Sequence, residues 1–249
     1  MSSVVGVSLS RVSRALRLPR IRPWTTTGPG LDRLISPEIT DDAFAQAIED
    51  VAATPGVREI LEIGSSAGEG STAAWVRGAM RNPILPRLHC IEVSVERHEA
   101  LVQRWKDRHF VHCYNLSSVP LERFPSAADV ERFYREVPSR LRDFDLDTVL
   151  GWLQQDVDYL RDHGLSCPGI ARIKEQHGLE GFDAVLIDGS EFTGSAELGE
   201  VYGARFLLLD DTMAFKNWEN VRRLETDPRY ELVRADSSRR NGFAVFERV

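Results

Sequence analysis

The sequence of 249 residues contains no run of eighteen or more apolar residues, so it predicts no transmembrane helix. It also has only three cysteines, Cys90, Cys113 and Cys167, and none of them belongs to a CxxC pair. An odd number of widely spaced cysteines argues against a disulfide framework and against a Cys-rich zinc site. Few, unpaired thiols are typical of a reducing compartment, and we expect a cytoplasmic protein.

Positive charge is also in deficit, because the formal net charge is -7 and the isoelectric point is about 5.5. Binding to a nucleic-acid backbone needs clustered lysines and arginines, so we expect no nucleic-acid partner. The first 31 residues are the exception, with five arginines and no acidic residue. We predict a basic extension over residues 1–30, which is a tail, a transit peptide or a contact with a membrane or partner. The folded domain is expected over residues 31–249.

Short apolar segments alternate with helical patterns along most of the chain. The expected strands cover residues 57–62, 88–93, 109–114, 182–187 and 204–209, followed by a closing pair at 230–235 and 242–247. A strand–helix–strand order is typical of a parallel sheet with helices on its faces. The sequence therefore predicts an α/β fold with a Rossmann-like, doubly wound and mostly parallel sheet that ends in an antiparallel hairpin.

A stretch of about 60 residues, 120–179, lies between the third and fourth expected strands and has helical patterns only. Its first amphipathic stripe should be interrupted at Pro138, because proline breaks a helix. A stronger stripe runs from Leu146 to Leu160, and a third short helix is expected from Pro168 to Gly178. Insertions of this length usually carry function. We expect a lid over the substrate pocket, a helical buttress, or a surface for a homodimer.

The stretch Leu61–Thr72 leaves the first strand and opens a helix. Its glycines allow a tight turn and close approach to a ligand, and the helix N-terminus offers unpaired N–H groups. A P-loop needs lysine where Gly70 stands, and a dinucleotide turn needs glycine where Ser66 and Glu69 stand. S-adenosylmethionine (SAM) remains, because it carries no phosphate and its cationic part suits the acidic Glu62.

Acidic or amide side chains follow the strands at the edge where a doubly wound sheet binds its ligands. They are Glu62, Glu92, Asn115, Asp188 and the pair Asp210-Asp211. Burying a bare carboxylate is costly, so each of these side chains needs solvent, a ligand or a partner. Five such strand ends in one sheet indicate a ligand site.

The order of these features resembles a known family. Glu62-Ile63-Gly64-Ser65-Ser66-Ala67-Gly68, with Ser71-Thr72 opening the helix, resembles the first motif of class I SAM-dependent methyltransferases. Glu92 matches their ribose-binding acid, and the closing hairpin matches their extra antiparallel strand. The resemblance implies the strand order 3-2-1-4-5-7-6 and SAM as the cofactor. The cofactor-binding residues that it implies are Glu62, Gly64, Ser65, Gly68, Ser71, Glu92, Asn115 and Asp188.

The later strand ends are similar to those of metal-dependent small-molecule O-methyltransferases of the catechol and caffeoyl-CoA types and their sugar-modifying relatives. That resemblance implies a metal held by Asp188, Asp210 and Asp211, whose hard oxygen ligands suit Mg²⁺. Glu191 stands where those enzymes carry a lysine or histidine base, so the implied catalytic residues are Asp188 and Glu191. Lys216 is an alternative base, although the pattern favours a solvent-exposed lysine at the start of a helix.

We therefore predict an enzyme that transfers a methyl group from SAM to a hydroxyl of a small-molecule acceptor, with Mg²⁺ as a second cofactor. Three alternatives stay open at this stage. One is a metal-independent methyltransferase that acts on another acceptor. The second is a SAM-binding or scaffold protein without catalysis, which the glutamate at position 191 would favour. The third is a nicotinamide-dependent dehydrogenase.

Overall fold

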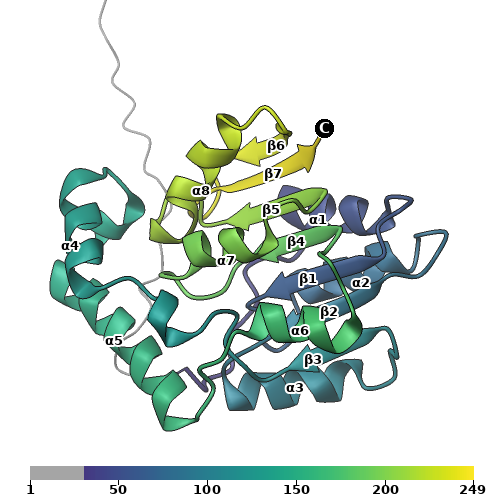
Figure 1. Cartoon of the computed structure of the whole chain (residues 1–249), viewed down its shortest axis with the longest axis horizontal. Helices are drawn as coiled ribbons and strands as arrows, with labels where there is room; N and C mark the ends of the chain where they lie inside the picture. Colours follow the sequence, from purple (N-terminus) through teal and green to yellow (C-terminus); the bar gives the residue numbers. More distant parts are fainter. Residues whose placement is uncertain (1–30) are drawn as a thin grey trace, which may run out of the picture.

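Seven strands form one sheet in the order β3-β2-β1-β4-β5-β7-β6 (Figure 1). The computed structural model describes residues 31–249, and the predicted basic extension over residues 1–30 lies outside the described residues. The strands are β1 Glu59–Ile63, β2 Arg87–Ile91, β3 Val111–Tyr114, β4 Ala184–Ile187, β5 Phe206–Asp210, β6 Tyr230–Asp236 and β7 Phe243–Arg248. Strands β1 to β5 pair in parallel, whereas β7 pairs antiparallel with both β5 and β6. The predicted fold class and strand order are confirmed.

The helices cover both faces of the sheet, and the alternation of strand side chains decides which core each residue joins. One core contains α1 Ala43–Ala53, α2 Ser71–Ala79 and α3 Val95–Trp105; the other contains α6 Gly169–His177, α7 Gly194–Val201 and α8 Phe215–Glu225. In β1, Ile60 packs into the first core and Leu61 and Ile63 into the second. In β5, Leu208 packs into the first core and Leu209 into the second. Because both faces are covered, β4 is apolar along its whole length and β5 is apolar up to its last residue, Asp210.

The predicted helical insertion divides into two parts. Helix α6 packs on the sheet as the crossover between β3 and β4, whereas α4 Ala127–Glu136 and α5 Leu146–Asp162 lie beyond the carboxyl ends of the central strands (Figure 1). Helix α4 ends before Pro138 and a short 3-10 turn, Arg140–Asp143, follows it, as expected for a proline there. A small core of its own joins α4 and α5 to Phe192 and Phe215, which follow β4 and β5.

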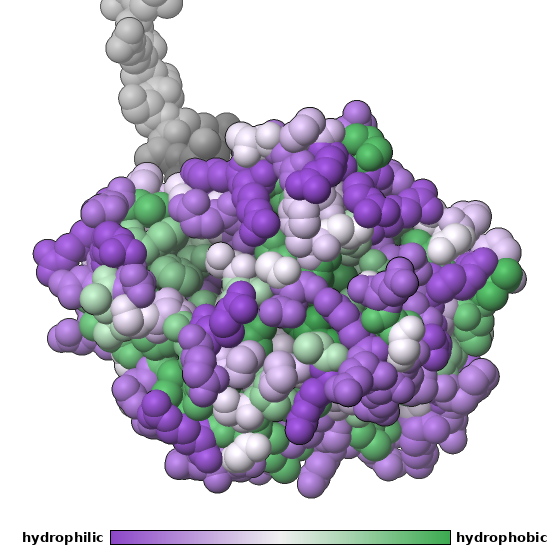
Figure 2. Space-filling model, in the orientation of Figure 1, coloured by the Kyte–Doolittle hydropathy of each residue, from purple (hydrophilic) through white to green (hydrophobic). Residues whose placement is uncertain are grey.

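A side-chain contact fixes the start of α1. Thr40 is a residue type that often caps helices, but the N-cap is Asp42, whose side chain accepts hydrogen bonds from the backbone N–H groups of Phe44 and Ala45. Among residues 31–249, no helix is both long enough and apolar enough to cross a membrane. The face shown in Figure 2 is mostly hydrophilic, with apolar residues in small scattered groups.

Candidate functional site

The glycine turn brings the end of β1 against the end of β4. Gly64 follows β1 directly and has a φ of +90°, a backbone conformation that residues with a side chain rarely adopt. A Cβ atom at this position would lie 2.2 Å from the backbone carbonyl oxygen of Asp188. Because the strand order reverses direction between β1 and β4, the turn lies at the switch point where doubly wound sheets bind their ligands.

Glu92 joins this turn to the end of β2. Its carboxylate accepts hydrogen bonds from the backbone N–H of Ser66 at 2.7 Å and from that of Ser94 at 2.8 Å. The side-chain amide of Asn115, after β3, donates to the backbone carbonyls of Glu92 and Val93, both at 2.9 Å. Burial raises the pKa of Glu92 above its ordinary value, against these hydrogen bonds. The ends of β1, β2 and β3 are therefore linked through Glu92.

Glu62 lies completely buried beneath the turn. One oxygen of its carboxylate accepts a hydrogen bond from Thr72 Oγ1 at 2.6 Å, which ties β1 to the first turn of α2. The other oxygen, Oε1, and the Ser65 hydroxyl have no partner among residues 31–249. Burial raises the pKa of Glu62. On the outer side of the turn, the indole N–H of Trp105 in α3 donates to the carbonyl oxygen of Gly68 at 3.2 Å.

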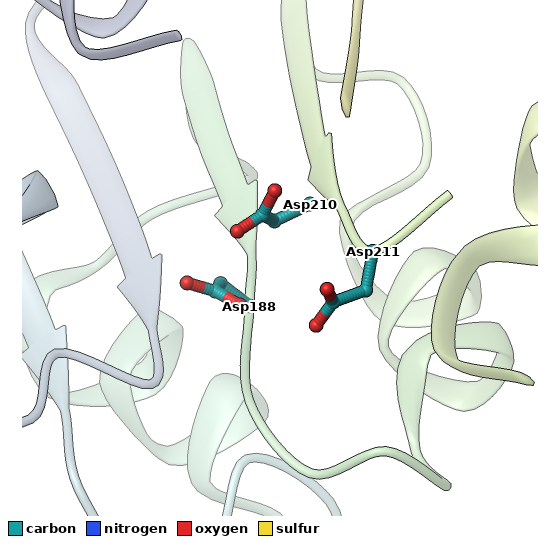
Figure 3. A group of neighbouring side chains, drawn as sticks. All are labelled: Asp188, Asp210 and Asp211. Atoms are coloured by element: carbon teal, nitrogen blue, oxygen red, sulfur yellow. The ribbon is translucent and has the colours of Figure 1, made fainter. Parts of the chain in front are cut away.

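Three aspartates converge at the ends of β4 and β5, as the sequence predicts (Figure 3). Asp188 follows β4, Asp210 is the last residue of β5, and Asp211 follows it. Each offers a carboxylate oxygen, and these oxygens all lie within 4.8 Å of one another. Asp211 has a φ of +52°, in the left-handed region that non-glycine residues seldom adopt. Such backbone conformations gather at functional sites, where the surrounding structure holds them.

A lysine also belongs to this group of aspartates. Lys216, the second residue of α8, places Nζ 2.9 Å from Asp188 Oδ1 and 2.7 Å from Asp211 Oδ2. Arg240, in the turn between β6 and β7, contacts Asp210 Oδ1 at 3.4 Å and also pairs with Asp42. Lys216 is only 5% exposed, so the expectation of a solvent-exposed lysine is wrong. The expectation that it stands at a helix start is correct.

Burial and mutual repulsion give the acidic groups of this cluster different pKa values. Burial, opposed by the Lys216 ammonium, raises the pKa of Asp188 to about 6, and burial with the charge of Asp211 raises that of Glu191 to about 8. Burial and the charge of Asp188 raise the pKa of Asp210 well above its ordinary value. Burial acts on Asp211 too, but Lys216 outweighs it and lowers the pKa of Asp211. Of the three aspartates, Asp211 is therefore the one whose carboxylate is most readily ionised.

Helix α5 connects both halves of this edge of the sheet. Asp156 accepts a hydrogen bond from the Ser190 hydroxyl, after β4, at 2.6 Å. One helical turn further, the Tyr159 hydroxyl accepts from the backbone N–H of Val95 at 2.9 Å and donates to Asp32. Burial raises the pKa of Asp156 to about 6. The inserted helix therefore spans the carboxyl edge from the end of β4 to the start of α3.

Sequence reasoning placed the predicted site residues at one edge of the sheet but missed four other residues that lie at this edge. Two of the missed residues are Arg240 and Asn241, which lie far along the chain in the closing hairpin turn. The other two are Asp156 and Tyr159, whose three-residue spacing puts them on one face of α5 and could have been noticed. The sequence pattern does not show that this face of α5 contacts the residues that follow β4 and β2.

Comparisons with known proteins complete the description of the site. The sequence matches no family model and no curated protein. Solved structures with a similar fold include a methyltransferase from Geobacter sulfurreducens, 11% identical with a TM-score of 0.46, in a match that covers 85% of this chain and 80% of that chain. They also include the O-methyltransferase from Bacillus cereus in complex with SAH, 15% identical with a TM-score of 0.45 over 82% and 80% of the two chains.

A third similar structure is the fibrillarin of Aeropyrum pernix with natively bound S-adenosyl-L-methionine. It is 13% identical with a TM-score of 0.41, over 81% of this chain and 72% of that chain. Identities and TM-scores this low carry no argument about activity. The fold of this chain is established by its own strand order and strand directions.

Proposed function

We propose that this protein is a SAM-dependent methyltransferase that acts on a hydroxyl of a small molecule. The observation that carries the proposal is the convergence of the glycine turn, Glu92 and Asp188 at the switch point between β1 and β4. The same edge carries a second acidic group at the ends of β4 and β5. One edge of the sheet thus combines a cofactor turn with residues suited to proton transfer.

The residues around the turn fit a cationic cofactor without phosphate. Glu62 and Glu92 have no cationic side chain within salt-bridge distance among residues 31–249. Glu62 Oε1 and Ser65 Oγ are buried polar atoms that lack partners and could serve an ammonium group. Glu92 would hold the ribose hydroxyls, and the turn would hold the methionine part. When bound, SAM supplies an activated methyl group on its sulfonium.

The acceptor would lie toward Asp188, Glu191 and Lys216, whose carboxylate and ammonium groups are natural hydrogen-bond partners of a hydroxyl. In its ionised form Glu191 would accept the proton of that hydroxyl: its pKa of about 8 makes this carboxylate a stronger base than an ordinary glutamate, and its ionised fraction increases as the pH rises toward that value. Helix α5 spans the edge above these residues, which favours a small acceptor over a folded macromolecule.

The Mg²⁺ ion that the resemblance implies is a separate part of the proposal. The three aspartates offer hard oxygen ligands, which suits Mg²⁺. However, the Lys216 ammonium already lies between Asp188 and Asp211, so these residues do not fit a metal as they are arranged. A metal-dependent enzyme would require Lys216 to leave this position, and we assign no catalytic step to a metal.

Calorimetry with SAM and with its demethylated product tests the proposal. We expect both to bind, and Glu92→Ala to weaken binding at least tenfold, because the carboxylate that orders the turn is removed. Glu99→Ala, at an exposed position of α3, is the matched control and should bind like the wild type. Absence of binding by the wild type would refute the proposal. Binding without formation of the demethylated product, in the presence of hydroxyl acceptors, would instead indicate a catalytically silent SAM-binding protein.

A further inference from the structure

We infer that Lys216 is the resident cation of the three-aspartate cluster, and that the cluster binds a divalent metal ion only when this lysine is removed. Lys216 Nζ lies 2.9 Å from Asp188 Oδ1 and 2.7 Å from Asp211 Oδ2, in the space where an ion shared by these carboxylates would lie. The inference concerns cation binding and does not require methyl transfer.

The backbone of Lys216 is fixed, so its direction is set by the fold. The side-chain amide of Asn217 donates to the backbone carbonyls of Ile187 at 3.1 Å and Asp210 at 2.6 Å, which clamps the start of α8 to the ends of β4 and β5. Gly194 of α7 packs so closely that a Cβ atom there would lie 2.0 Å from the carbonyl oxygen of Lys216. Because these contacts hold the helix start on both sides, the lysine points into the cluster without an alternative backbone position.

Four of the six carboxylate oxygens of the aspartates already contact protein donors. Asp211 accepts from Asn241 Nδ2 at 3.0 Å through Oδ1 and from Lys216 through Oδ2. Asp188 Oδ1 accepts from Lys216, and Asp210 Oδ1 contacts Arg240. Mg²⁺ demands near-octahedral oxygen ligands at about 2.0–2.1 Å. A divalent ion placed here would meet the ammonium of Lys216 at short range with little water to screen the repulsion.

The residue type supports the same conclusion. The chain has only three lysines, Lys106, Lys174 and Lys216, among 31 basic residues. An ammonium is a compact charge with three donors, whereas the planar guanidinium of arginine suits side-by-side pairing with one carboxylate. Two of the three donors of Lys216 contact Asp188 and Asp211, and the third has no partner among residues 31–249. If the proposed function is correct, this third N–H is free to donate to the acceptor oxygen.

Manganese binding, followed by electron paramagnetic resonance, tests the inference on the full-length protein. We expect no saturable Mn²⁺ site in the wild type at submillimolar concentration. Lys216→Met removes the ammonium but keeps an unbranched side chain up to the ε position, and it should create one Mn²⁺ site that binds at least tenfold more tightly than the wild type binds Mn²⁺. Lys174→Met, which removes a lysine that donates to the Glu200 carbonyl away from the cluster, should behave like the wild type. Adding Asp211→Asn to Lys216→Met should abolish the new site.

A second measurement uses the wild-type protein alone, so it does not depend on the folding of any variant. In ¹⁵N-lysine-labelled wild type, only three ammonium signals are possible. The Lys216 signal should remain unchanged when Mg²⁺ is added, because the ion does not displace the lysine. A wild-type Mn²⁺ site, a Lys216 signal that responds to Mg²⁺, or a folded Lys216→Met variant that gains no site would each overturn the inference. Calorimetry with SAM reports separately on the proposed function.

Discussion

The two halves of the carboxyl edge hold their acidic side chains in different ways. In the half formed by β1 to β3, Glu62 and Glu92 accept hydrogen bonds from neutral groups, namely a hydroxyl and backbone N–H groups. In the half formed by β4 and β5, the aspartates are paired with the cations Lys216 and Arg240. The first half therefore keeps negative charge available to a cationic ligand, whereas the second supplies its own counter-charge.

This difference gives each half a physical role. A carboxylate that is held by neutral donors is oriented but not neutralised, so it can still attract a sulfonium or an ammonium group. A carboxylate paired with a buried cation has little net attraction for a further cation. The comparison predicts cofactor binding at the first half, and an acceptor site that works with an ammonium group at the second.

The largest effect is expected where the two halves meet. Gly64→Ala would place a Cβ atom 2.2 Å from the Asp188 carbonyl oxygen and force an alanine to a φ of +90°. We expect a loss of more than about 4 kcal/mol in the free energy of unfolding, or no folded protein, because backbone atoms on both strands would have to move. Urea denaturation measures the loss.

Gly151→Ala is the matched control for this substitution. Gly151 lies inside α5, and a Cβ atom there would meet no atom within 4 Å. Replacing a glycine inside a helix by alanine should stabilise the protein by roughly 0.5–1 kcal/mol. If Gly64→Ala were tolerated as well as Gly151→Ala, the two strand ends would not be in contact as described.

Two conservative substitutions in the second half, Asp211→Asn and Asp210→Asn, should lower the free energy of unfolding by clearly different amounts. Asp211 is ionised and accepts from both Lys216 and Asn241, so Asp211→Asn should lower the free energy of unfolding by about 2–3 kcal/mol at pH 7. Burial and the charge of Asp188 raise the pKa of Asp210 well above its ordinary value, so its ionised form contributes less to stability and Asp210→Asn should cost less than about 1 kcal/mol. Chemical denaturation of both variants provides the comparison. Equal losses would mean that the charge is not divided between the two positions as proposed.

The fold was predictable from the sequence because each signal for it is local. The alternation of apolar strands with amphipathic helices needs only neighbouring residues, and an acidic residue directly after a strand must lie at the carboxyl edge. For this reason the sequence could predict that Asp188, Asp210 and Asp211 lie close together, as they do in the structure. The closing hairpin was predictable for the same reason, from two apolar segments and a polar turn.

The partners of those acids were not predictable, because they depend on how elements distant in the sequence are oriented. The sequence placed Lys216 at the start of a helix but did not show which face of that helix is buried. Helix α8 begins at Phe215, and Lys216 lies on its buried face. Arg240 reaches Asp210 only because β7 inserts between β5 and β6. Tertiary contacts of this kind leave no periodic signal in the chain.

The smallest effect expected is a dependence of stability on pH that belongs to the second half. The pKa of Glu191 is raised to about 8 in the folded protein, from an ordinary value of 4.5. Because the folded state then holds a proton that the unfolded state has released, the free energy of unfolding falls as pH rises between these two values. From pH 6 to pH 7 the contribution of Glu191 to this fall is about 1 kcal/mol.

Glu191→Gln should remove that contribution, so its stability should change less with pH than that of the wild type. Glu62 and Glu92 also have raised pKa values and give a slope of the same sign, so the informative quantity is the difference between variant and wild type. Glu219→Gln, at an exposed position of α8, is the control and should keep the wild-type slope. If Glu191→Gln also kept it, the pKa of Glu191 would not be raised in the folded protein, and its carboxylate would be no stronger a base than that of an ordinary glutamate.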